Sequence, residues 1–101
     1  MATWIRVAEG TVVSTTVSPA SGKAFTLVEL NRMVGGYLEA LNLDDGRIMW
    51  VNEEGKLHGL PLNPVADRIA HSQTGIAPWD RVVGDVVIAT PEESGDGEEE
   101  E

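Results

Sequence analysis

The chain contains no cysteine, few aromatic residues and no long apolar run, and each shortage excludes a class of protein. Without cysteine there are no disulfides, no thiolate catalysis and no cysteine-ligated zinc site. No segment approaches the roughly 18 consecutive apolar residues of a membrane span. The first residues also lack the basic and apolar regions of a secretory signal. We therefore expect a cytoplasmic protein that does not bind membranes.

Basic residues are scarce as well. The chain has 7 Lys and Arg and 17 Asp and Glu, which gives a formal charge of −10. Seven of the carboxylates lie in residues 91–101, which leaves ten acids, seven bases and a charge of −3 for residues 1–90. The segment of residues 91–101 is too polar to bury enough apolar surface to offset the entropy lost when a chain becomes ordered. We predict a single domain over residues 1–90 and a disordered acidic tail over residues 91–101.

The acidic charge also bears on nucleic acids. An acidic protein is a poor ligand for a phosphate backbone, so no direct nucleic-acid binding is expected. The tail is most simply a solubilising segment, with binding to a partner or mimicry of a nucleic acid as alternatives.

Runs of β-forming residues predict the strands. Residues 4–8 and 11–17 form a hairpin around Glu9-Gly10, and residues 37–43 pair with residues 47–51 across an Asp-Asp-Gly turn at 44–46. Residues 56–60 are expected to form a short edge strand. Residues 81–90 are almost continuously apolar, which is typical of a central strand covered on both faces.

Two short helices have recognisable start signals. Thr26 and Glu29 fit a capping box, and Gly35 fits a left-handed cap, so residues 27–34 are predicted to be helical. Asn63 as N-cap and Pro64 as the first helical residue open a second helix.

We expect Val65 and Ile69 to form the buried stripe of this second helix, and residues 71–78 to form a loop. The order β-β-α-β-β-β-α-β describes an α+β fold with a small, mostly antiparallel sheet and two short helices.

Polar side chains are densest between residues 52 and 63, the segment that could line a ligand or partner site. Turns collect such residues for structural reasons too, so a purely structural role is the competing interpretation. Glu39 stands out as a carboxylate among apolar neighbours, and it is either a buried acid with a partner or a residue on the solvent face. Trp79 directly follows the expected loop and is a credible interface anchor, with packing over a sheet edge as the equal alternative. The candidate ligand- or partner-binding residues are Tyr37, Glu39, Asn52, Glu53, Lys56, His58, Asn63 and Trp79.

No set of residues predicts catalysis, a metal site or a cofactor. Asp67 and His71 are four apart and share a helix face, but two ligands do not make a metal site, and His58 would have to complete it. Neither histidine lies in a recognisable catalytic motif. We therefore expect a protein that is not an enzyme.

Four short motifs in a fixed order resemble a known family: Val34–Glu39, Asn52–Leu57, Gly59–Asn63 and Gly84–Ile88. The family is the domain of unknown function 3846, which occurs in bacteriophages, plasmids and their hosts, especially actinobacteria. The resemblance covers roughly residues 4–90. It implies an accessory protein of a phage or mobile element and, if phage-encoded, a location in the host cytoplasm.

The leading hypothesis is a small non-enzymatic binding protein that occupies a host protein or a small signalling ligand, in host takeover or defence evasion. An acidic nucleic-acid mimic is the alternative, followed by a small hydrolase that uses Glu39 or Glu53. Homo-oligomerisation through a sheet face or edge is a further expectation, because a small sheet with few helices leaves apolar surface to cover.

Overall fold

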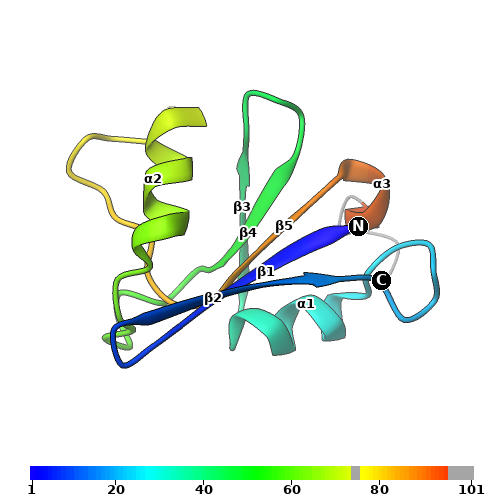
Figure 1. Ribbon diagram of the computed structural model, residues 1–101, viewed down its shortest axis with the longest axis horizontal. Helices are drawn as coiled ribbons and strands as arrows, with labels where there is room; N and C mark the ends of the chain where they lie inside the picture. The colour runs from blue at the N-terminus through cyan, green and yellow to red at the C-terminus, as the bar shows by residue number, and fades with distance from the viewer. Residues whose placement is uncertain (74–75, 96–101) are drawn as a thin grey trace.

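The computed structural model describes residues 1–73 and 76–95 and contains one five-stranded sheet flanked by helices (Figure 1). The sheet has the order β2-β1-β5-β4-β3, and all neighbouring strands are antiparallel. This confirms the predicted α+β class and the mostly antiparallel sheet. The elements are β1 (Ala2–Ala8), β2 (Thr11–Val17), α1 (Leu27–Val34), β3 (Leu38–Asn42), β4 (Ile48–Asn52), α2 (Pro64–Gln73), β5 (Val86–Ala89) and α3 (Pro91–Ser94).

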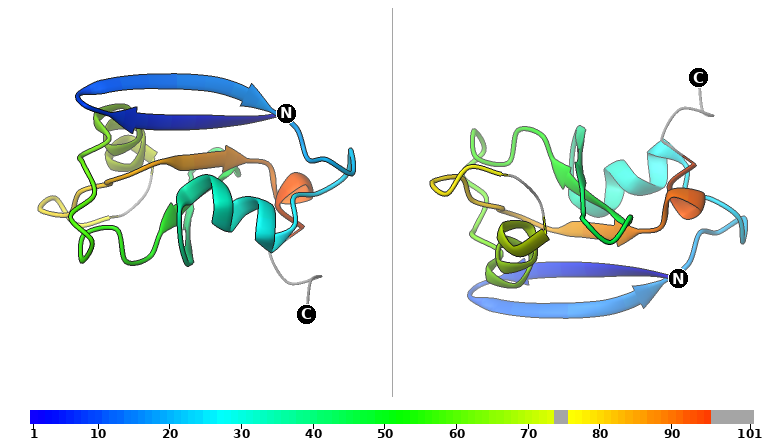
Figure 2. Two further views of the ribbon diagram at one scale, coloured as in Figure 1. Left: turned by 90° about the horizontal axis from the view of Figure 1, so that it is seen from below. Right: turned by 90° about the horizontal axis from the view of Figure 1, so that it is seen from above.

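The strand β5 lies at the centre of the sheet, between the β1–β2 hairpin and the β3–β4 hairpin (Figure 2). All four of its residues are buried, as expected for a strand covered on both faces. The predicted strand was longer, over residues 81–90, and that length is wrong. Gly84 has a left-handed φ of 76° that breaks the extended run, and only a single bridge joins Leu62 to Val83 before it.

Alternation along β5 divides the core into two parts. Val86 and Ile88 contribute to the cluster that includes Ala66 and Ala70 of α2. Val87 and Ala89 contribute to the cluster on the opposite face, which packs under α1. This cluster also holds Phe25, Leu30, Val34 and Trp50. The two helices therefore cover opposite faces of one sheet, which we call the α1 face and the α2 face.

The helix α1 has the predicted bounds and the predicted caps. The Thr26 hydroxyl accepts from the Glu29 backbone N–H, and the Glu29 carboxylate accepts from the Thr26 N–H. Gly35 ends the helix in the left-handed conformation, at φ 84° and ψ 19°. Phe25, before the cap, and Leu30, in the first turns of the helix, are buried in the same cluster, which is typical of a hydrophobic staple at a helix N-terminus.

The helix α2 differs from its prediction in length and in phase. It continues to Gln73, so residues 71–73 are helical rather than part of a loop. Its fully buried residues are Ala66 and Ala70, whereas Val65 is exposed and Ile69 is only half-buried. The predicted stripe of Val65 and Ile69 is therefore wrong for Val65. Both Val65/Ile69 and Ala66/Ala70 have helical spacing, and the small alanine side chains are the ones that pack against the sheet.

The expected strand at residues 56–60 is absent, and tight turns replace it. The Gly55 N–H donates to Asn52 O (3.2 Å), Gly59 to Lys56 O (3.2 Å) and Leu60 to Gly55 O (3.0 Å). Because these backbone donors bond locally, they cannot form a ladder with another strand.

The start of the acidic segment is also ordered, which contradicts the prediction of disorder for residues 91–95. Thr90 and Glu93 form a second capping box at the N-terminus of α3. Ser94 is fully buried, and its hydroxyl accepts a hydrogen bond from Nε1 of Trp50 at 3.0 Å. Residues 96–101, the remainder of the predicted tail, lie outside the described residues.

Candidate functional site

A pocket of about 180 Å³ opens on the α2 face of the sheet. Its wall is formed by β3, β4, the turns that follow β4, and the segment that connects α2 to β5. Apolar side chains of the core, among them Leu41, Val51 and Val82, line part of it. Six lining residues are polar or charged: Glu39, Asn52, Glu53, Lys56, Asp80 and Arg81.

Asn52 shapes the turns that carry one side of the pocket. Its side chain is 8% exposed, and its Oδ1 accepts from the Glu54 backbone N–H at 2.8 Å. Its Nδ2 donates to Val34 O at 3.4 Å, so the same residue ties the end of α1 to the end of β4. This arrangement holds Glu53 and Lys56 at the mouth of the pocket.

Lys56 and Asp80 form an ion pair across the pocket. The hydrogen bond from Lys56 lowers the pKa of the Asp80 carboxyl, and the Arg81 backbone N–H, 2.9 Å from Oδ1, lowers it further. Asp80 is therefore ionised at neutral pH. The positive charge of Lys56 is neutralised within the site.

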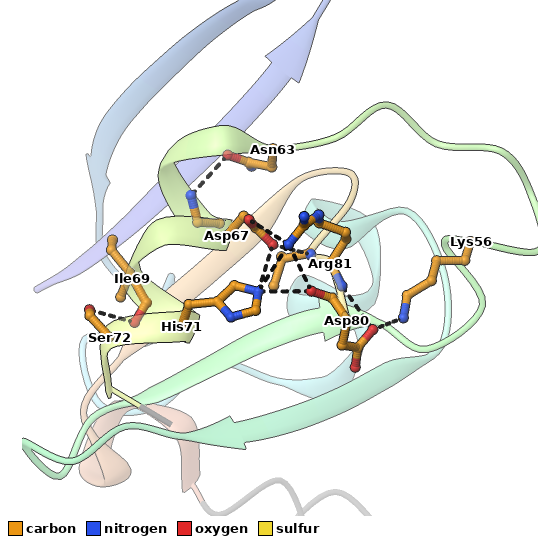
Figure 3. Close-up of polar contacts among 10 residues, drawn as sticks. Lys56, Asn63, Asp67, Ile69, His71, Ser72, Asp80 and Arg81 are labelled. Atoms are coloured by element: carbon orange, nitrogen blue, oxygen red, sulfur yellow. Dashed lines mark hydrogen bonds and ion pairs between the residues drawn. The ribbon is translucent and has the colours of Figure 1, made fainter. Parts of the chain in front are cut away.

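The helix α2 anchors the segment that carries Asp80 and Arg81 (Figure 3). Asp67 Oδ1 accepts from the Val82 backbone N–H at 2.9 Å. His71 Nε2 lies 2.8 Å from the Asp80 carbonyl oxygen. Since a carbonyl oxygen only accepts, Nε2 must carry the proton in this contact. The i, i+4 pair on α2 therefore has a positioning role.

Arg81 lies beside this anchor, with Nη1 at 3.9 Å from Asp67 Oδ2 and 3.5 Å from His71 Nε2. His58, the third residue considered for a metal site, instead lies 3.3 Å from Glu54 Oε1 within the turns after β4. Among residues 1–73 and 76–95, no group of three or more His, Asp or Glu side chains is arranged to hold a metal ion.

The pocket brings together four of the eight candidate residues predicted from the sequence: Glu39, Asn52, Glu53 and Lys56. Tyr37 is 68% exposed, and its carbonyl oxygen accepts from the Glu53 N–H, so it lies across from Glu53 beyond the paired strands. Trp79 is 83% exposed and directly precedes Asp80.

Asn63, another of the candidates, is fully buried and has structural partners. Its Oδ1 accepts from the Ala66 N–H at 3.1 Å and so caps α2. Its Nδ2 donates to Ile5 O at 3.2 Å and to Gly84 O at 2.9 Å. The residue joins α2, β1 and the segment just before β5, and it is not among the residues that line the pocket.

Sequence reasoning missed Asp80 and Arg81. Their charges stand next to the exposed Trp79, at the end of a loop-like segment, and that juxtaposition was the available signal. The contact of Asp80 with Lys56 could not be predicted from neighbouring residues, because the two are 24 positions apart in the sequence.

These features define a small α+β domain with an open, charged pocket on one face of its sheet. The family model for the domain of unknown function DUF3846 matches residues 5–100, and the chain belongs to this family. The match confirms the resemblance inferred from the four motifs. No curated protein and no solved structure matches the chain significantly. None of the helices in the described ranges is long and apolar enough to cross a membrane.

Proposed function

We propose that this protein is a small non-enzymatic binding protein that recognises a partner protein through the pocket and its apolar surroundings. The observation that carries the proposal is the exposure of two large apolar side chains at this site. Leu57 lines the pocket and is 84% exposed, and Trp79, next to the lining residue Asp80, is 83% exposed. Tryptophan is enriched among the residues that dominate binding energy at protein interfaces.

The size of the pocket favours a protein partner over a small signalling ligand. Its volume of about 180 Å³ falls below the range of roughly 300–1,000 Å³ that is usual for small-molecule sites. A single inserted side chain fits such a space. The surrounding apolar residues then supply the contact area that one side chain cannot.

The chemistry of the pocket supports binding more than catalysis. A general acid needs a pKa near the working pH, whereas the pKa of Asp80 is lowered. The proton of His71 Nε2 is engaged by the Asp80 carbonyl. Glu39 and Glu53 are exposed to solvent, and replacing either by Gln tests the hydrolase alternative, which predicts loss of turnover.

A phage or mobile-element origin and action in the host cytoplasm are part of the same proposal, and for these two points it rests on what the family resemblance implies. Gene neighbourhood is the direct test. Genes for phage structural or replication proteins beside this one would support the origin, and a conserved chromosomal metabolic operon would contradict it.

Site-specific photo-crosslinking tests the binding surface. A crosslinking amino acid at position 57 or 79 should capture the same partner from host lysate. The same group at Val28, which is 61% exposed on α1, is the matched control and should not capture it. Equal capture from all three positions, or capture from none together with binding in a nucleotide-ligand screen, would overturn the proposal.

Truncation tests the alternative that the acidic tail mimics a nucleic acid, and the position of the truncation decides whether the fold is also affected. Ending the chain after residue 90 would remove Ser94 and Glu93, which contact Trp50 and the N-terminal amine. Ending it after Gly95 removes only residues 96–101. Loss of activity in this shorter truncation would favour mimicry by the tail. The expected homo-oligomer stays a prediction, and light scattering of the purified chain measures it.

A further inference from the structure

We infer that the pocket receives a positively charged side chain, an arginine or lysine of the partner protein. The inference rests on the proposed function and specifies its chemistry. In the described part of the pocket, the cations have acidic neighbours, whereas two of the carboxylates have no ion-pair partner.

Both cations of the pocket have acidic neighbours. Lys56 is paired with Asp80, and Arg81 lies 3.9 Å from Asp67 on α2. Glu39 and Glu53 form no ion pair within the described part of the chain. The pocket therefore presents two uncompensated carboxylates to its occupant.

The sheet register places these carboxylates near each other. Glu39 pairs with Val51, and Glu53 lies two residues beyond Val51, in the turn directly after β4. The Glu53 N–H donates to Tyr37 O at 2.8 Å, so the antiparallel pairing extends to this position. Diagonal neighbours of this kind are about 7–8 Å apart between their Cα atoms, and like charges so placed repel. A cation bound between them removes that repulsion.

The apolar wall selects among cations. Leu41, Val51 and Val82 lie in the same pocket as the two carboxylates. Arginine and lysine have a long apolar stem with a charge at its end, and the stem packs on apolar surface while the head remains at a polar rim. Leu57 and Trp79 beside the pocket favour a side chain presented by a protein over a free amine.

The test uses the full chain and three acetylated, amidated tripeptides, Gly-Arg-Gly, Gly-citrulline-Gly and Gly-Glu-Gly. Citrulline retains the shape of arginine and removes its charge. Binding is followed through the backbone amide NMR signals of residues 39–57. The arginine peptide should bind about tenfold more tightly than the citrulline peptide, the loss expected for one charge-assisted hydrogen bond. Added salt should weaken it, because the site is open to solvent.

Variants separate the pocket from the overall negative charge. Glu39→Gln and Glu53→Gln should each weaken arginine binding several-fold. Glu9→Gln removes the same charge in the β1–β2 turn and should leave it unchanged. Lys56→Gln should strengthen binding, since it frees the Asp80 carboxylate.

Preference for the glutamate peptide, equal binding of arginine and citrulline, no binding of any peptide up to its solubility limit, or an equal loss in Glu9→Gln would each overturn the inference. Crosslinking at positions 57 and 79 reads out the partner surface without reference to charge. Failure of the charged probes with successful crosslinking therefore rejects the cationic ligand and retains the binding function.

Discussion

The two faces of the sheet are covered by helices that contribute different side chains to the core. On the α1 face, large residues such as Phe25, Leu30 and Trp50 fill the space between helix and sheet. On the α2 face, the helix contributes alanines to the core. Polar groups of the same helix hold the segment before β5, and the pocket opens beside it. A helix that contributes bulky core residues closes the first face, whereas the second face, where the helix contributes alanines, has a pocket beside the helix-held segment.

The largest effect should come from a cavity on the α1 face. Leu30 is fully buried, and Leu30→Ala should lower the free energy of unfolding by about 2–5 kcal/mol. Chemical denaturation measures the loss. Val28→Ala on the exposed side of the same helix is the control, with a change of about 0.5 kcal/mol or less. Similar losses in the two variants would show that α1 does not pack as described.

On the α2 face, a buried polar residue should also be sensitive to substitution. Asn63→Ala removes the cap of α2 and leaves the carbonyl groups of Ile5 and Gly84 without this donor. We expect a destabilisation of about 2–3 kcal/mol. The exposed Asn42 on β3 is the matched control. An unchanged denaturation midpoint in Asn63→Ala would contradict the joining role of this side chain.

A smaller loss of stability should follow where α3 contacts the core of the α1 face, at the hydrogen bond between Ser94 and Trp50. Ser94→Ala deprives Trp50 Nε1 of its buried acceptor, at a cost of about 1–2 kcal/mol. Tryptophan fluorescence, to which Trp4 and Trp79 also contribute, reports the change together with denaturation. Ser72→Ala alters an exposed serine of α2 and should be nearly neutral. If Ser94→Ala were equally neutral, α3 would not contribute to the core.

The smallest effect concerns pH at the pocket. Because Lys56 and the Arg81 N–H lower the pKa of Asp80 below its ordinary 3.8, its contribution to stability is fully present above about pH 4 and is lost as the pH falls through the lowered value. Asp80 is partly exposed, so the contribution should stay below about 1 kcal/mol.

Asp80→Asn should remove this part of the acid dependence and lower the free energy of unfolding between pH 6 and 8 by less than about 1 kcal/mol. Denaturation at a series of pH values measures it. A variant with the same acid dependence as the natural chain would show that the Lys56–Asp80 pair is not maintained in solution.

Much of the local structure was predictable because its determinants lie within a few residues of each other. Thr26 and Glu29 of the capping box are three positions apart, and the β1–β2 hairpin turns over Glu9-Gly10. The second capping box, at Thr90 and Glu93, has the same spacing. It was overlooked because the charge of the surrounding segment suggested disorder.

Half of the candidate residues meet in the pocket, and the reason is again local. Asn52 ends β4, Glu53 and Lys56 lie in the turns that follow it, and Glu39 lies on the strand paired with β4. Asp80 and Arg81 join them from a segment that α2 positions through Asp67 and His71. No sequence spacing encodes that approach.

The sequence by itself determined the α+β class, the helix at residues 27–34, the first hairpin and the concentration of charge after residue 90. In each case the deciding interactions are short-range hydrogen bonds, alternation of side chains or composition. Only the tertiary structure decided the strand order, the burial of alanines in α2, the ordering of α3 by Trp50 and the pocket itself. These depend on contacts between residues far apart in the chain, whose free energy is gained only when the whole sheet has assembled.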